Sequence, residues 1–277
     1  MEKYEYIDGE GNAHLICQSD TDGDYSVDAE DGWDDSNVEL HIEASPNRYS
    51  SHYRGLSYSE RDYVLTVSVR AASPLALQAA KRQWKSWHNR ELGEGYVRRT
   101  LENGEARCLD CIPGQSKWTA LSNPCLARIE QHYVAAWPFW RDNVASTASG
   151  TMNGATLVNV SCSNEGDIPA PLQVLFTGIC HTPRITDPDG DYQEFAAEMV
   201  NADDTIVVDN RPHGETQRYR YSQEHGSGAE TPVSCSSGSA LLWVPRGTNN
   251  LTLSGAAGET STAQVDLLWY DQYESLC

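Results

Sequence analysis

Two cysteines have a spacing that could hold a metal ion or form a redox pair. Cys108 and Cys111 are separated by two residues, but the sequence has no second pair at a matching distance. Completing a zinc site would require a ligand from elsewhere in the chain. Because free cysteine is among the most buried residue types, we expect inert, buried thiols here, with a metal site or a disulfide as alternatives. No cofactor is predicted.

Alternating carboxylates could form a calcium site near the N-terminus. Asp20, Asp22 and Asp24 stand at every second position, and calcium takes six to eight oxygen ligands. Tyr25 occupies the position at which the EF-hand loop needs glycine, so that motif is incomplete. A solvated acidic turn is the preferred interpretation, with calcium as the alternative. No metal site is predicted with certainty from this segment.

The residues that usually carry out catalysis show no organised pattern. The eight histidines are scattered, and no pair of them has the spacing of zinc ligands on a helix. The sequence has neither a Gly-x-Ser-x-Gly nucleophile elbow nor a phosphate-binding glycine loop. We therefore predict that the protein is not an enzyme and has no catalytic residues.

An aromatic group precedes a change in composition near residue 145. Trp137, Phe139 and Trp140 could stack against sugar rings, or they could pack between two domains. The second interpretation is favoured. Residues 143–153 are rich in Ser, Thr, Ala and Gly, a composition typical of domain boundaries. The sequence therefore predicts a first domain at 1–145 and a second at 146–277.

The charge of the chain is distributed unevenly. The net charge is −20, with −13 in residues 1–44, +5 in 45–142 and −12 in 143–277. Unlike charges at different places on one chain can attract copies head to tail, and such an interface closes into a ring or extends as a filament. The acidic total argues against sequence-specific binding of nucleic acid. No apolar run is long enough to span a membrane.

One amphipathic helix is predicted over residues 74–92. Ser73 is a suitable N-cap, Pro74 suits the first helical position, and Gly93 suits the end. Apolar residues recur at spacings of three and four along one face. Basic residues lie away from that stripe and are candidates for a charged interface between copies: Lys81, Arg82, Lys85 and Arg90.

The remaining elements are predicted to be strands. Residues 1–70 contain a hairpin around Gly9–Gly11 and alternating runs at 38–42 and 63–69, and Asn103-Gly104 predicts another hairpin. From residue 154 onward, short apolar runs alternate with turn residues. This pattern favours a sandwich or jelly roll. The predicted fold class is mainly β with one helix, in which an α+β domain precedes a β-sandwich.

The order of these segments resembles the distal tail protein family of long-tailed phages, the siphovirus-type tail component. In the first half, Arg54-Gly55 precedes a strand, the Ser73-Pro74 helix and the Asn-Gly hairpin. In the second half, the similar stretches are Pro171–Gly178, Pro183–Ile185, Ala202–Asp209, Leu242–Leu251 and Val265–Tyr273.

This resemblance implies a structural role in the virion, at the tail tip. It implies a first domain that assembles as a ring, expected to be hexameric, and a galectin-like second domain that carries adhesion proteins. The implied partners are further copies of the chain, the tail tube protein and the tail hub or tip protein, with the tape measure protein and host glycan as additional candidates. The alternative function is that of a glycan-binding β-sandwich adhesin.

Overall fold

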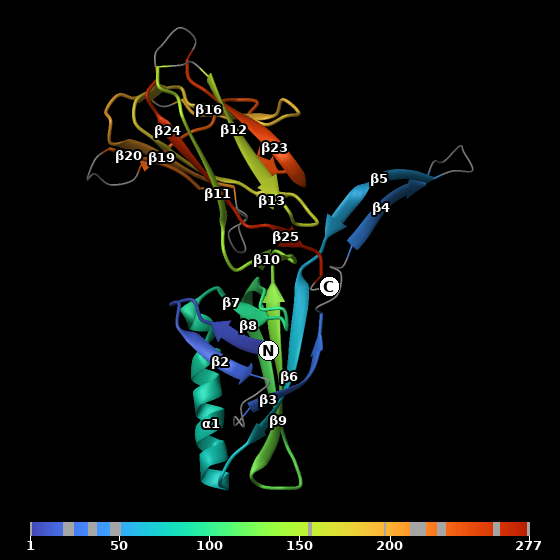
Figure 1. Ribbon diagram of the computed structural model, residues 1–277. Helices are drawn as coiled ribbons and strands as arrows, with labels where there is room; N and C mark the ends of the chain where they lie inside the picture. The colour runs from blue at the N-terminus through green and yellow to red at the C-terminus, as the bar shows by residue number, and fades with distance from the viewer. Residues whose placement is uncertain are drawn as a thin grey trace. The chain divides into compact units, whose positions relative to one another are not determined.

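The structure, a computed structural model, describes residues 2–18, 25–32, 38–44, 51–154, 157–196, 198–210, 220–225, 231–256 and 261–275 (Figure 1). The chain forms two compact units. Unit 1 consists of Met1–Asn143 together with Tyr273–Cys277, and unit 2 is Val144–Gln272. The chain therefore leaves unit 1, forms unit 2 and returns to unit 1. The sequence-based division assigned residues 273–277 to the second domain, 146–277, whereas they cluster here with unit 1.

Unit 1 is built on antiparallel strands in the order β2-β1-β7-β8-β9-β6-β3, with β10 paired to both β8 and β25. Its hydrophobic core lies between these strands and helix α1. The strands are β1 (Lys3–Ile7), β2 (Ala13–Gln18), β3 (Tyr25–Asp31), β6 (Arg61–Arg70), β7 (Gly95–Thr100), β8 (Ala106–Ala120), β9 (Leu126–Ala135), β10 (Trp140–Asp142) and β25 (Gln272–Tyr273).

Strand β8 belongs to two parts of this sheet system. Its first half pairs with β7. Its second half pairs with β9 from Ile112 onward, and this pairing contains a bulge between Pro113 and Ser116. Gly114 lies in this bulge, where an added Cβ would approach the carbonyl oxygen of His132 to 3.1 Å. A bulge bends a strand and increases its local twist. The sequence analysis did not predict a strand through Pro113-Gly114, because both residue types usually end strands.

Both predicted hairpins of unit 1 are confirmed. β1 pairs with β2 from Ile7↔Ala13 to Lys3↔Gln18, and β7 pairs with β8 from Thr100↔Ala106. Gly104 has a φ of 89°, a conformation that the tight turn requires and that glycine adopts without strain.

Helix α1 (Pro74–Trp87) begins as predicted but ends earlier than predicted. The Ser73 hydroxyl accepts a hydrogen bond from the Ala76 N–H at 3.1 Å, and Pro74 occupies the first turn. The predicted extension to residue 92 is wrong. The Asn89 side chain accepts from the Glu91 N–H and starts a separate 3-10 turn, Arg90–Leu92. Asn89 has extended backbone angles, so the α-helix cannot continue through it.

Unit 2 contains two larger antiparallel sheets and two short pairs. One sheet has the order β11-β24-β14-β19-β20-β21, the other β12-β23-β16-β17, and the pairs are β13-β22 and β15-β18. The strands are β11 (Ser146–Thr151), β12 (Leu157–Asn164), β13 (Ala170–Pro171), β14 (Gln173–Thr177), β15 (Cys180–His181), β16 (Arg184–Thr186), β17 (Tyr192–Glu194), β18 (Glu198–Met199), β19 (Asp204–Asp209), β20 (Arg220–His225), β21 (Thr231–Pro232), β22 (Trp243–Val244), β23 (Gly247–Ser254) and β24 (Gln264–Trp269).

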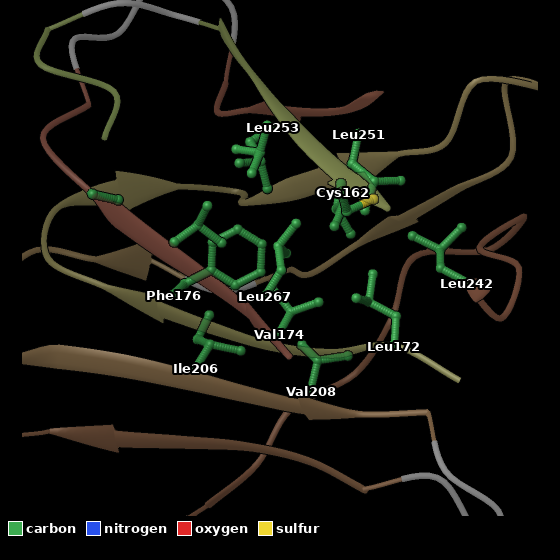
Figure 2. Packing of buried hydrophobic residues seen from close by; sticks show 14 of the residues in the cluster. Cys162, Leu172, Val174, Phe176, Ile206, Val208, Leu242, Leu251, Leu253 and Leu267 are labelled. Atoms are coloured by element: carbon green, nitrogen blue, oxygen red, sulfur yellow. The ribbon is translucent and has the colours of Figure 1, made fainter. Parts of the chain in front are cut away.

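The core of unit 2 fills the space between the two larger sheets. Alternate residues of β12 and of β24, which belong to different sheets, are buried, as expected when one face of a sheet packs against another. Figure 2 shows Leu251 and Leu253 of one sheet pointing toward Val174 and Phe176 of the other. The predicted fold class, mainly β with one helix and a sandwich in the second half, is confirmed.

A buried aromatic residue lies between two short strands of unit 2. β17 ends at Glu194 and β18 begins at Glu198. Between them, Phe195 is fully buried and forms an isolated bridge with Cys235. The apolar pattern here results from one anchoring aromatic side chain, not from a continuous strand.

Candidate functional site

A two-stranded hairpin of unit 1 lies outside the main sheet. β4 (Val38–Ala44) and β5 (Ser51–Tyr58), which we call the arm, pair with each other and, among the described strands, with no other. The sequence analysis identified residues 38–42 as a strand but missed β5. The register pairs Val38 with Tyr58, Leu40 with Leu56 and Ile42 with Tyr53.

In the sequence of β4, Glu39, His41 and Glu43 alternate with apolar residues. The register of the arm shifts between His41 and Ile42. A two-stranded hairpin that stands alone is marginally stable in water.

The aromatic residues identified in the sequence lie at the base of the arm. The Phe139 ring meets Tyr58, the last residue of β5, edge-on at 4.7 Å between centroids, and Trp137 meets Phe139 at 5.1 Å. Trp140 is fully buried and contacts Tyr63 edge-on at 5.3 Å. Phe139 is 5% exposed, so neither Phe139 nor Trp140 presents a ring face to solvent. The Phe139–Tyr58 contact joins the end of the arm to the segment that precedes β10.

The exposed side of α1 is cationic. Lys81, Arg82 and Lys85 are exposed, and no carboxylate of the described residues forms an ion pair with any of the three. The Lys81 ammonium lies 5.5 Å from the centroid of the Trp118 ring. Arg90 differs from the others because its Nε donates to the Pro113 carbonyl oxygen at 2.9 Å. The three residues of α1 form the cationic face, and Arg90 braces the bulge of β8.

Buried hydrogen bonds fix α1 against the sheet. The Trp84 Nε1–H donates to Oε1 of Gln131 at 3.0 Å. His88 Nδ1 lies 2.9 Å from the Trp84 carbonyl oxygen. A carbonyl oxygen can only accept, so Nδ1 carries the proton of the neutral ring. Nε2 therefore accepts a hydrogen bond from the Tyr133 hydroxyl at 2.7 Å. Burial lowers the pKa of His88 from 6.5 to about 4, so the imidazole is neutral at pH 7.

A second polar cluster joins β3 to three other strands. Glu30 of β3 accepts from the hydroxyls of Tyr4 at 3.3 Å and Tyr63 at 2.8 Å, and it pairs with Arg99 at 2.6 Å. Burial raises the pKa of Tyr4 and Tyr63, and the Glu30 charge raises them further. The cluster holds the last strand of the sheet order to β1 and β7. Sequence reasoning missed it because 69 residues separate Glu30 from Arg99.

The two cysteines with metal-ligand spacing lie on one strand but not on one face of it. Cys108 and Cys111 both lie on β8, where residues three apart point to opposite faces. Both are buried, and burial raises the pKa of the Cys108 thiol to about 11. Within the described part of the chain, no group of three potential ligands could hold a metal ion. Asp20, Asp22 and Asp24 lie outside the described residues.

The two-unit, β-rich fold is similar to that of solved phage hub and baseplate structures. Solved structures resemble it over 97% of this chain and 98% of theirs. The SPP1 Dit (gp 19.1) protein, described as a paradigm of the hub adsorption apparatus in phages that infect Gram-positive bacteria, has a TM-score of 0.62 at 10% identity. Phage P2 baseplate structures in the activated conformation, with Ca and with Sr, each have a TM-score of 0.57 at 9% identity.

These likenesses confirm the predicted resemblance at the level of the fold. By sequence, no protein-family model and no curated protein matches the chain. Among the helices of the described residues, none has the length and apolar character needed to cross a membrane.

Proposed function

We propose that this protein is a structural component of a phage tail tip that assembles through unit 1 into a closed ring, expected to be hexameric. The ring would join the tail tube to the hub, and unit 2 would carry adhesion proteins. The fold across nearly the whole chain supports a tail or baseplate role, because every similar structure named above is a phage hub or baseplate protein. No arrangement of catalytic side chains competes with this interpretation in the described residues.

The arm is the observation that supports assembly most directly. No other described strand pairs with either of its strands, and polar residues alternate with apolar ones along β4 in the sequence. A neighbouring copy can pack against the arm, and repetition of the same contact around an axis closes a ring. Lys81, Arg82 and Lys85 offer a second contact, since the chain carries acidic segments that could face them in the adjacent copy.

Size and shape of the purified protein test this proposal. We expect light scattering to give a multiple of the 30.7 kDa chain mass and negative-stain images to show rings with a central hole. The substitutions Leu40→Asp and Leu56→Asp, at positions that pair across the arm, should shift the protein to monomers. Glu39→Gln with Ser57→Ala changes the pair at the other alternation and should leave rings intact.

Two outcomes would contradict the proposal. Rings that persist unchanged in the Leu40→Asp/Leu56→Asp variant would remove the arm from the interface. A protein that remains monomeric at high concentration and does not assemble with tail tube or hub proteins would refute the ring itself. Reversal of Lys81, Arg82 and Lys85 to Glu separately tests the cationic face, and it should weaken assembly more at low salt than at high salt.

A further inference from the structure

Residues near the C-terminus return to unit 1 and are held there by two arginines. Tyr273 and Glu274 follow unit 2 in the sequence but pack with unit 1. The Arg107 guanidinium lies over the Tyr273 ring, 4.1 Å from its centroid. Arg107 also pairs with Asp142 of β10, whose second carboxylate oxygen lies 3.5 Å from the Tyr273 hydroxyl.

The second arginine, Arg61, donates a hydrogen bond to the backbone of Glu274. Arg61 is 4% exposed, and its Nη2 donates to the carbonyl oxygen of Glu274 at 2.6 Å. A buried guanidinium is stable only when its donors find acceptors, so this carbonyl is part of what allows Arg61 to lie inside unit 1. Returning strand β25 also pairs with β10, the strand through which the chain leaves unit 1.

Gln272, the residue before Tyr273, forms hydrogen bonds within unit 2. The Gln272 carbonyl oxygen accepts from the backbone N–H groups of Asp167 at 2.8 Å and Ile168 at 3.4 Å. Gly166 packs so closely that an added Cβ would lie 2.3 Å from that oxygen. The chain thus passes from one unit to the other between two adjacent residues, Gln272 and Tyr273, with no linker between their anchors.

We propose that Tyr273 and Glu274, gripped by Arg107 and Arg61, form a clasp that anchors the second covalent connection between the units. With the clasp closed, unit 2 is attached at both of its ends. With the clasp open, unit 2 remains attached only through residues 143–146. The clasp is therefore a device that restricts movement of unit 2 and allows strain applied to unit 2 to reach β10 and β8 of unit 1. It does not depend on ring formation.

Hydrogen exchange of the full-length protein tests the clasp. Tyr273→Ala removes the ring on which Arg107 stacks, and we expect amides of residues 272–275 and 140–142 to exchange roughly tenfold faster or more. Scattering profiles should also show a wider distribution of interatomic distances. The milder substitution Tyr273→Phe keeps the ring and should preserve most of the protection. If Tyr273→Ala does not fold, exchange at residues 272–275 is compared between Tyr273→Phe and the wild-type protein instead.

Arg184→Ala provides a matched control. Arg184 stacks on Tyr192 with 3.7 Å to the centroid and has the acidic partner Glu194, but it belongs to unit 2, whereas the clasp residues belong to unit 1. This substitution should leave exchange at 272–275 unchanged. Equal protection at 272–275 in folded Tyr273→Ala, folded Arg107→Ala and wild-type protein would overturn the proposal. Increased exchange throughout unit 1 in both variants would also overturn it, because the segment would then be a general part of the core.

Discussion

His88 should make the stability of unit 1 depend on pH. Its imidazole is buried between α1 and the sheet, stacks on Tyr6 at 4.8 Å and accepts a hydrogen bond from Tyr133. Burial holds its pKa at about 4 in the folded protein, against 6.5 in the unfolded chain. One pKa unit corresponds to about 1.4 kcal/mol, so the full effect is about 3 kcal/mol.

The direction follows from which state binds the proton. As the pH falls below about 6.5, His88 of the unfolded chain becomes protonated, while the folded imidazole stays neutral down to about 4. The unfolded state therefore binds more protons in this window, and the free energy of unfolding falls with falling pH. About 2 kcal/mol should be lost by pH 5, and the loss should be complete below pH 4.

Urea unfolding between pH 4.5 and 8 measures this effect, with amide exchange of unit 1 used to separate it from unfolding of unit 2. His88→Gln should lower the free energy of unfolding at pH 7. It should also make that free energy less dependent on pH, by an amount that corresponds to close to one bound proton. His132→Gln is the control, because Asp62 and Glu130 raise the pKa of the half-exposed His132. The small contribution of His132 is present below its unfolded pKa and is lost as the pH rises through its folded pKa. A His88→Gln variant that keeps the wild-type slope would refute the reasoning.

Three other substitutions test the packing of unit 1. Glu30→Gln removes the charge that pairs with Arg99 and should lower the free energy of unfolding by roughly 2–4 kcal/mol, measured by thermal or urea unfolding. Glu105 is the control because its side chain is 55% exposed, and Glu105→Gln should lower the free energy of unfolding by less than about 1 kcal/mol. Gly95→Ala places a Cβ 2.2 Å from a backbone oxygen of β1, and loss of protection in β1 and β7 is expected by hydrogen exchange; an unchanged Tm would contradict it. Ser73→Ala should lower stability by about 1 kcal/mol through loss of the N-cap, and Ser73→Asp should retain it.

Local patterns predicted the elements that depend on local interactions. The start of α1 followed from Ser73-Pro74, and the β7–β8 hairpin followed from Asn103-Gly104, because capping and turn chemistry involve neighbouring residues. The sandwich of unit 2 followed from alternating apolar residues between turns. The end of α1 was misplaced because Asn89, an ordinary polar residue in the sequence, caps the next turn.

The features that depend on distant residues were not predictable in the same way. Glu30 meets Arg99, and Arg61 meets Glu274, across separations that leave no periodic pattern. The aromatic residues near 137–140 were recognised as a group, but their burial depends on Tyr58 and Tyr63. The cationic residues of α1 were identified correctly as lying off its apolar stripe, since helical periodicity alone places them there.

The division of unit 1 into two separated parts of the chain has a consequence for biosynthesis. A ribosome adds residues in order at roughly 5–20 per second, so the first 143 residues emerge several seconds before the segment that completes their unit. Unit 2 is a continuous stretch and can fold as soon as it is released, whereas β10 must wait for β25. Nascent chains therefore complete unit 1 only after the whole of unit 2 has been synthesised.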